Sequence, residues 1–322
     1  MKWSRELRIA RRSMRTALRA ATAMAVARAS VPATPARIQP LESTRPALVA
    51  MTGFGSNPGR LSMLVHLPDD DPARCRPLVV LLHGCGQAAA TFARSSGWLA
   101  LSDQLGIPLV LPEQADENNQ GRCFNWFRPD HTGRGRGEAL SIRQMVATAV
   151  ERFGSDPSRV FIAGLSAGGA MAAALLAAYP DVFAAGAVVA GLPVGAAASV
   201  PEALRRMAEA GPDRSPLEWA AQVRQAAPPQ YRGPWPRLSV WHGAADRVVD
   251  PANARLIAAQ WASVHGIDQA SKESVDLSGM RRDRWGAAGR PLVELCSVPD
   301  LAHDWPPGSA RNMAEFWQIA GD

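Results

Sequence analysis

Cysteine, long apolar runs and nucleotide-binding glycine motifs are scarce or missing in this sequence. Four cysteines among 322 residues are too few to build a disulfide scaffold. No Cys/His cluster has the spacing of a zinc site, and no phosphate-binding glycine motif opens a predicted helix, so we expect no metal and no cofactor. No apolar run reaches the roughly 18 residues of a membrane-spanning helix, so we expect no transmembrane segment.

Positive charge is unevenly distributed along the chain. The formal net charge is +6, but residues 1–28 hold eight basic residues against one acidic residue. The rest of the chain therefore carries a formal charge of −1. Because a nucleic-acid-binding domain should carry a basic face on its folded body, we expect no nucleic-acid partner.

Residues 1–46 form a basic tail followed by a linker rich in Pro and Ala. One interpretation is an export signal, with an apolar run at Ala20–Ala27 and a small-residue cleavage site at Ala27–Ala29. The alternatives are a basic amphipathic helix that contacts an anionic surface, and a disordered segment. The export signal is favoured, which predicts a secreted or periplasmic protein, with the cytoplasm as the alternative.

Residues 47–322 alternate between apolar runs and helical stretches. The predicted buried strands are Pro77–His83, Leu109–Leu111, Arg159–Leu165, Phe183–Ala190, Leu238–His242 and Leu292–Val298. The predicted helices include Phe92–Leu105, Glu138–Phe153 and Ala167–Tyr179, and residues 192–236 read as a small helical insertion. This alternation predicts an α/β fold with a mostly parallel central sheet flanked by helices. In such sheets ligands bind beyond the carboxyl ends of the strands.

Gly164–Gly168 (GLSAG) lies where a predicted strand ends and an Ala-rich helix begins. A serine on such a sharp strand-to-helix turn is lifted above the sheet edge, and the flanking glycines avoid collisions within the turn. The alternative is a glycine-rich structural turn without chemistry. The surrounding strand and helix favour Ser166 as a nucleophile.

A nucleophilic serine needs a histidine base and an acid that orients it. On this fold the chain order is serine, acid, histidine, which leaves His265 and His303 as bases. His303 is favoured because it follows the last predicted strand. Asp246, after the strand ending at His242, is the favoured acid. Asp250 fits the start of a helix better, and Asp304 is an outside candidate.

The tetrahedral intermediate of acyl transfer needs two N–H donors. The predicted donors are the backbone amides of Ala167 and of Cys85, which follows the first buried strand. Cys85 and Cys123 fall in loops at the same end of the sheet, so a disulfide between them is geometrically possible, and such a bond would favour an oxidising compartment. The aromatic loop 122–127 either lines a substrate pocket or plugs the sheet edge. The substrate-pocket candidates are His83, Trp126 and Trp305.

Seven motifs together resemble the poly(3-hydroxybutyrate) depolymerase family of esterases, within the α/β-hydrolase superfamily. They are TGFGSNPG (Thr52–Gly59), LVVLLHGCGQ (Leu78–Gln87), CFNWF (Cys123–Phe127), GEALSIRQMV (Gly137–Val146), RVFIAGLSAGGAM (Arg159–Met171), AGLPVG (Ala190–Gly195) and SVWHGAADRVVDPANA (Ser239–Ala254). The resemblance implies a nucleophile at Ser166, an acid at Asp246, a base at His303, and oxyanion donors at Cys85 and Ala167. It also implies a substrate that is a small ester or a polyester oligomer.

Two features depart from the family pattern. The family's histidine usually follows a glycine, whereas Ala302 precedes His303 here. Secreted family members carry a separate polymer-binding domain, and we expect no dedicated one in this sequence. The predicted function is therefore hydrolysis of short-chain hydroxyalkanoate esters or oligomers through an acyl-enzyme. The alternatives are a feruloyl or acetyl esterase acting on plant-polysaccharide esters, a peptidase, and a non-catalytic binding protein of the same fold.

Overall fold

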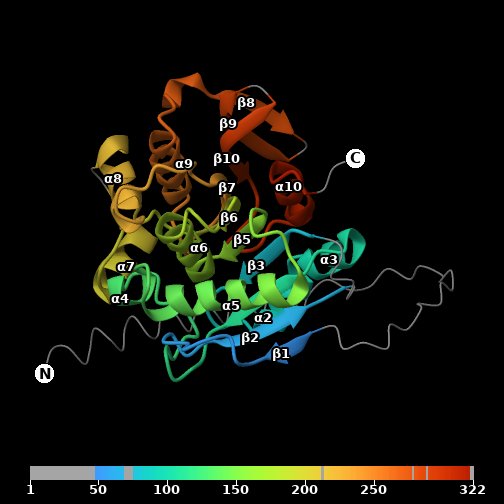
Figure 1. Ribbon diagram of the computed structural model, residues 1–322. Coiled ribbons are helices and arrows are strands. Elements are labelled where there is room, and N and C mark those ends of the chain that lie inside the picture. Colours follow the sequence, from blue (N-terminus) through green and yellow to red (C-terminus); the bar gives the residue numbers. More distant parts are fainter. Residues whose placement is uncertain (1–47, 69–74, 212–213, 278, 288, 320–322) are drawn as a thin grey trace, which may run out of the picture. The chain divides into compact units, whose positions relative to one another are not determined.

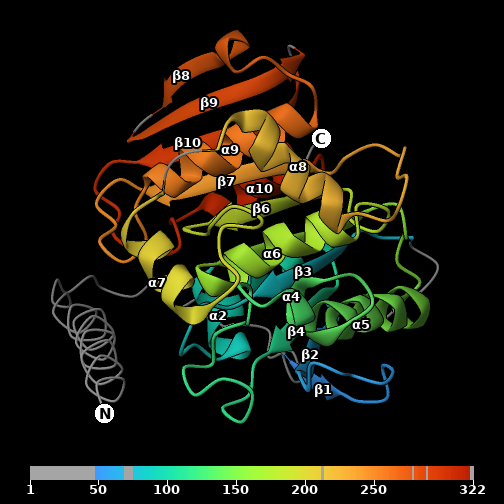
Figure 2. The same cartoon turned by 90° about the vertical axis from the view of Figure 1, so that its left-hand side faces the viewer.

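A ten-stranded sheet forms the centre of the fold (Figures 1 and 2). The structure is a computed structural model that describes residues 48–68, 75–211, 214–277, 279–287 and 289–319. The strands lie in the order β1-β2-β4-β3-β5-β6-β7-β10-β9-β8. Their bounds are β1 Val49–Met51, β2 Ser62–His66, β3 Leu78–Leu82, β4 Leu109–Glu113, β5 Val160–Leu165, β6 Ala185–Val189, β7 Arg237–Gly243, β8 Glu273–Leu277, β9 Met280–Ala287 and β10 Arg290–Val298.

The middle of the sheet is parallel, as predicted. Neighbouring strands from β4 through β3, β5, β6 and β7 to β10 all pair in parallel. β3 and β5 are buried along their whole length, which is why their sequences read as continuous apolar runs. Their carboxyl ends meet at one edge, and the loops that follow them carry the residues singled out from the sequence.

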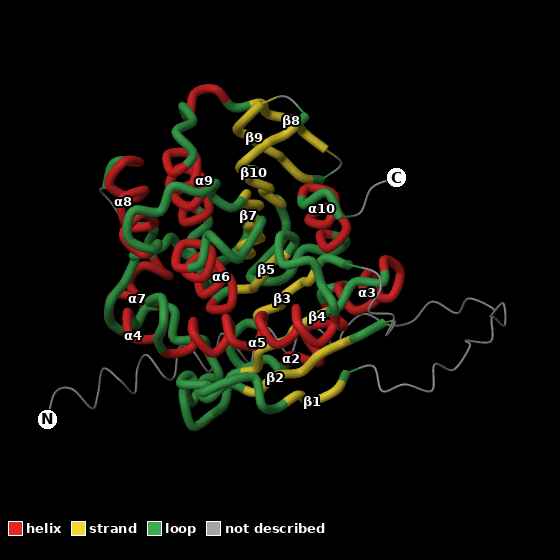
Figure 3. Tube along the Cα trace, viewed as in Figure 1, coloured by secondary structure: helices red, strands yellow, loops and turns green. Residues whose placement is uncertain are grey.

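Helices cover both faces of this sheet (Figures 1 and 3). Their bounds are α2 Ala89–Ser95, α3 Trp98–Leu105, α4 Pro129–Thr132, α5 Gly137–Phe153, α6 Ala167–Ala178, α7 Val200–Ala208, α8 Pro216–Ala226, α9 Ala252–Val264 and α10 Ser309–Phe316, with a 3₁₀ turn η1 at Gln269–Ser271. Alternate residues of β3 point to opposite cores: Val80 packs with α5, α6, α8 and α9, while Val79 packs with α2, α3 and α10. The α/β-hydrolase architecture therefore has two hydrophobic layers.

One predicted helix was wrong in detail, and one hairpin was missed. The stretch 92–105, expected as one helix, is split into α2 and α3 at Gly97, whose φ of 80° is left-handed. The hairpin β8–β9 was not predicted at all. It extends the sheet in antiparallel fashion beyond β10, and β8 is exposed along its whole length. The expected insertion at 192–236 is present as α7 and α8.

The predicted tail and export signal, residues 1–46, lie outside the described residues. Among the helices that the structure does describe, none is long and apolar enough to cross a membrane.

Candidate active site

Ser166 lies on the sharp turn between β5 and α6. Its φ of 57° and ψ of −119° are strained for a residue with a side chain. A Cβ at Gly164 would stand 2.2 Å from the carbonyl oxygen of Gly168, and one at Gly168 would stand 2.3 Å from that of Leu82. Both glycines are therefore required by close backbone packing, and the turn presents Ser166 at the sheet edge.

His303 connects Ser166 to Asp246. Its Nε2 is 2.9 Å from the Ser166 Oγ, and its Nδ1 is 2.7 Å from Asp246 Oδ2. His303 comes from the loop after β10, and Asp246 from the loop after β7. The two loops touch directly, since the Ala245 amide donates to the Leu301 carbonyl at 3.1 Å. The structure thus brings together the three side chains predicted as nucleophile, base and acid, in hydrogen-bonding order.

Asp246 is buried and accepts hydrogen bonds on both carboxylate oxygens. Oδ1 accepts from the amides of Val248 at 2.8 Å and Val249 at 3.0 Å, while Oδ2 accepts from His303 and from His242. Burial alone would raise the pKa of Asp246, but the hydrogen bonds from the two histidines and the Val249 amide hold that pKa well below its usual range. The acid is therefore charged and fixed in orientation.

The weaker candidates for acid and base have other partners. The carboxylate of Asp250 accepts from the amides of Ala252 and Ala210, at the start of α9. His265 Nε2 donates to the Pro236 carbonyl at 3.1 Å. Asp304 Oδ1 accepts from the Trp305 amide. These contacts give all three residues local structural roles.

The predicted oxyanion donors lie on two neighbouring loops. Ala167 is the first residue of α6 and follows Ser166, whereas Cys85 follows β3. Within the described chain neither amide donates an intramolecular hydrogen bond, so both remain available to an oxyanion. Cys85 forms a disulfide with Cys123, the pairing that the sequence allowed. The adjacent Gly86 amide donates to the Gly121 carbonyl at 2.8 Å, which ties the same two loops together.

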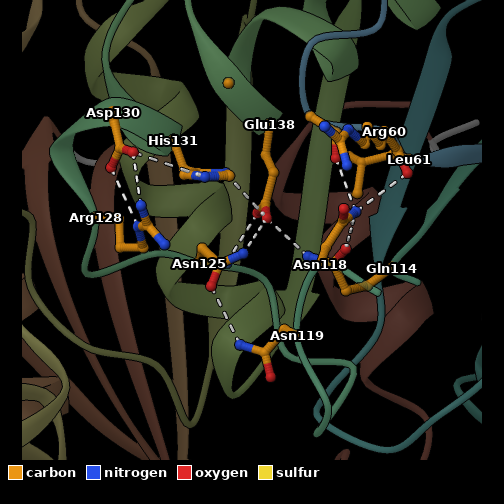
Figure 4. Close-up of polar contacts among 12 residues, drawn as sticks. Arg60, Leu61, Gln114, Asn118, Asn119, Asn125, Arg128, Asp130, His131 and Glu138 are labelled. Carbon is orange, nitrogen blue, oxygen red and sulfur yellow. Dashed lines mark hydrogen bonds and ion pairs between the residues drawn. The ribbon is translucent and has the colours of Figure 1, made fainter. Parts of the chain in front are cut away.

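The buried carboxylate of Glu138 accepts hydrogen bonds from Asn125, in the aromatic loop, and from Gln114, which follows β4 (Figure 4). Oε1 accepts from Gln114 Nε2 at 2.7 Å and from Asn125 Nδ2 at 2.6 Å, and Oε2 accepts from the Asn125 amide at 2.8 Å. His131 Nδ1 lies 3.3 Å from Oε1. Gln114 Nε2 also donates to the Cys123 carbonyl. Glu138, in the first turn of α5, therefore anchors the segment to which Cys85 is bonded.

The pocket candidate His83 has a different place from the one predicted. Its side chain is fully buried, its Nε2 accepts from the Gln114 amide at 3.1 Å, and its Nδ1 donates to the Gly84 carbonyl at 2.8 Å. Burial lowers the pKa of His83, so the ring is neutral, as these two contacts require. With no exposed surface, His83 cannot contact a substrate, and it supports the loop that carries Cys85 instead.

The two tryptophan candidates also differ from each other. Trp305 is buried against Phe92, edge to face at 5.2 Å, in the core on the side of α2 and α10, so it packs rather than lines a pocket. Trp126 is half-buried and packs on the small apolar cluster that contains Ala170 and Val249. Since that cluster adjoins the turns of Ser166 and Asp246, Trp126 is the tryptophan that remains a pocket candidate.

Two polar residues beside the site were missed from the sequence alone. Glu138 resembles an ordinary acidic residue in a first helical turn, and His242 was noted only as the end of a strand. The available signal was position, because His242 lies near the end of β7, four residues before Asp246. No cluster of three or more His, Cys, Asp or Glu side chains suited to a metal ion is found in the part of the chain that the structure covers.

Comparison with known proteins agrees with this geometry. Residues 61–283 match the model of the family described as esterase PHB depolymerase. Poly(3-hydroxyalkanoate) depolymerase C of Paucimonas lemoignei is 42% identical over 83% of this chain, which spans 64% of that protein. Feruloyl esterase B of Talaromyces stipitatus is 33% identical, over 85% of this chain and 76% of the esterase.

Among solved structures, an acetyl xylan esterase from Aspergillus awamori superposes with a TM-score of 0.77 and 25% identity. The match covers 85% of this chain and all of the esterase. Its fold, the central parallel sheet with helices on both faces, is that of the α/β-hydrolase esterases. The family match and the sequence identities lead to the same conclusion: the chain belongs to the PHB depolymerase family of esterases.

Proposed function

We propose that this protein is a serine carboxylic-ester hydrolase that cleaves short-chain hydroxyalkanoate esters or oligomers through an acyl-enzyme. The observation that carries the proposal is the pair of hydrogen bonds, 2.9 Å and 2.7 Å long, that run from Ser166 through His303 to Asp246. A hydroxyl, an imidazole and a carboxylate in this order make the serine a nucleophile.

In the first half of the reaction, the Ser166 Oγ attacks the ester carbonyl carbon while His303 Nε2 takes the hydroxyl proton. The developing oxyanion accepts hydrogen bonds from the amides of Ala167 and Cys85. Asp246 holds the imidazole through Nδ1 and stabilises the imidazolium that forms. His303 then gives its proton to the departing alcohol oxygen as the carbon–oxygen bond breaks, which leaves an acyl ester on Ser166.

In the second half, a water molecule replaces the alcohol. His303 removes a proton from this water as its oxygen attacks the acyl carbon, and a second oxyanion forms at the same two amides. The proton then returns to the Ser166 Oγ as the acyl–serine bond breaks and the carboxylic acid leaves. Because the imidazole must be neutral to accept a proton, we expect activity to fall as the pH is lowered.

Hydroxyalkanoate esters are the proposed substrates because the 42% identity to a poly(3-hydroxyalkanoate) depolymerase exceeds the 33% identity to a feruloyl esterase. Esters of plant polysaccharides are the second candidate, supported by the feruloyl esterase and by the acetyl xylan esterase structure. The half-buried Trp126 is the proposed wall of the acyl pocket.

The proposed location is outside the cytoplasm, secreted or periplasmic. The disulfide between Cys85 and Cys123 supports this, because such bonds persist in oxidising compartments and are rare in the cytosol. The basic tail with its small-residue cleavage site agrees with export.

A Ser166→Ala variant tests the chemistry. We expect it to keep the circular dichroism spectrum of the wild type while losing hydrolysis of p-nitrophenyl butyrate and covalent labelling by a fluorophosphonate probe. Ser95→Ala, which removes an exposed hydroxyl at the end of α2, is the matched control and should keep both activities. Hydrolysis or labelling that survives Ser166→Ala would reject Ser166 as the nucleophile.

A substrate panel tests the proposed specificity. We expect a higher kcat/KM for 3-hydroxybutyrate oligomers than for methyl ferulate or acetylated xylan. A preference for methyl ferulate would assign the protein to the feruloyl esterases, and hydrolysis of peptides alone would overturn the esterase proposal.

A further inference from the structure

The carboxylate of Asp246 has a second histidine on the side away from Ser166. Asp246 Oδ2 lies 2.7 Å from His303 Nδ1 and 3.0 Å from His242 Nε2. His242 is the second-last residue of β7 and is 2% exposed, so its ring is fixed by the protein interior. The reaction described above uses one of these two imidazoles and leaves the other without a role.

The contacts of His242 determine which nitrogen carries its proton. Nε2 faces Asp246 Oδ2 and also the Val249 carbonyl oxygen, each at 3.0 Å. Both are acceptors, so Nε2 must be the protonated nitrogen. Nδ1 is buried without a hydrogen-bond partner within the described residues. His242 therefore shares one N–H between the carboxylate and the loop that follows it.

The titratable groups around His242 come from two loops. Asp246 and Asp250 lie on the loop between β7 and α9, and His303 lies on the loop after β10. The neighbouring position on β10 is Ser297, which has no charge. The N–H of His242 therefore contacts the same carboxylate oxygen of Asp246 as His303 does.

We propose that His242 is a positioning residue for the acid of the triad: its N–H fixes the orientation of the Asp246 carboxylate and shares the negative charge of Oδ2 with His303. This inference rests on the proposed function of the Ser166, His303 and Asp246 group. Two donors on one oxygen weaken the pull of that oxygen on each donor. His303 is therefore held less tightly as an imidazolium and returns more readily to the neutral form that accepts the serine proton.

His242→Phe removes the N–H while keeping a planar ring. We expect kcat/KM at its plateau to fall about tenfold, because the carboxylate loses one of the donors that fix its orientation. We also expect the acid limb of the pH profile of kcat/KM to move up by about half a pH unit, since Oδ2 then pulls on His303 alone. His242→Gln, which can still donate from its side-chain amide, should restore most of both properties.

His265→Phe is the matched control. His265 is half-buried and also bonds a backbone carbonyl, that of Pro236, but it does not touch the triad. Loss of His265 should lower stability in urea without moving the acid limb. An acid limb that moves equally in His242→Phe and His265→Phe, or in neither, would overturn the inference.

If His242→Phe does not fold, the comparison of His242→Gln with His242→Asn decides, because asparagine is too short to reach Oδ2. An equal acid limb in these two variants would contradict the proposal. A failure of the proposed function would look different, since the wild type itself would then neither hydrolyse p-nitrophenyl butyrate nor react with a fluorophosphonate.

Discussion

Glu138 offers a test of how the loop that carries Cys85 is held in place, because the Glu138 carboxylate can be replaced by an uncharged amide of the same shape. In Glu138→Gln one carboxylate oxygen becomes an NH₂ group. Gln114 and Asn125 contact this carboxylate through N–H groups (Figure 4). The donor nitrogens lie 2.6–2.8 Å from the carboxylate oxygens. Whichever way the new amide turns, its NH₂ group faces at least one N–H, so at least one hydrogen bond is lost.

The size of the effect follows from the number of bonds. A hydrogen bond to a charged group contributes about 1.5–3 kcal/mol, and a buried N–H left without an acceptor adds a desolvation cost. We therefore expect Glu138→Gln to lower the free energy of unfolding by about 2–4 kcal/mol. Loss of a whole oxyanion donor costs about 10²–10³ in kcat, so a partial displacement of Cys85 should lower kcat by about tenfold.

Urea unfolding and the kinetics of p-nitrophenyl butyrate hydrolysis measure the two effects. Glu151→Gln is the matched control, since Glu151 lies on the same helix, α5, but is exposed. Its stability should stay within about 0.5 kcal/mol of the wild type. If Glu138→Gln unfolds at the same urea concentration as Glu151→Gln and keeps its kcat, the carboxylate does not anchor this loop.

Two further predictions concern the disulfide and the catalytic acid. Reduction of the Cys85–Cys123 disulfide should lower kcat, because this bond ties the Cys85 loop to the aromatic loop. A Cys75→Ser variant, which lacks the exposed free thiol, should lose kcat on reduction to the same extent as the wild type. A kcat unaffected by reduction would refute this role of the disulfide. Asp246 has a lower pKa in the folded protein than in the unfolded chain, so its ionised form stabilises the fold. This stabilisation is fully present above the unfolded pKa of about 3.9 and is lost as the pH falls toward the lower folded pKa. The difference in free energy of unfolding between wild type and Asp246→Asn should therefore shrink as pH is lowered from about 5 to about 2, and a constant difference would contradict this.

The parallel centre of the sheet was predictable because burial on both faces leaves a plain signal. Strands such as β3 and β5 are apolar at every position, and the expected runs bracket them within one or two residues. The hairpin β8–β9 left no such signal. β8 is exposed throughout and β9 is rich in arginine, so their strand character comes from pairing with β10 rather than from burial.

The helix break at Gly97 shows a different limit. The apolar spacing of residues 92–105 continues across the glycine, because both α2 and α3 pack on the same core. Periodicity reports which face is buried, and it does not report a change of axis between two short helices that share that face.

The hydrogen-bonded group of Ser166, His303 and Asp246 was predictable because strand ends, chain order and family motifs all select the same residues. The residues that hold it in place were not, since their roles depend on contacts across the fold. Glu138 and Asn125 are separated by 13 residues, and Glu138 looks like a solvated residue of a first helical turn until the loop folds over it. Likewise, His83 ends a strand at the active edge, as a pocket residue would, but the Gln114 backbone covers it.

Asp246 and Glu138 are buried carboxylates, and burial is what allows them to hold their loops in one arrangement. Taking a carboxylate out of water costs several kcal/mol unless donors surround it, so such a group adds little net stability. It does, however, penalise every arrangement in which one of its donors is missing. Asp246 with its four donors and Glu138 with its three therefore restrict the loops after β7 and β4 to one geometry. Such restriction is what a reaction needs when its nucleophile, base and oxyanion donors come from separate loops.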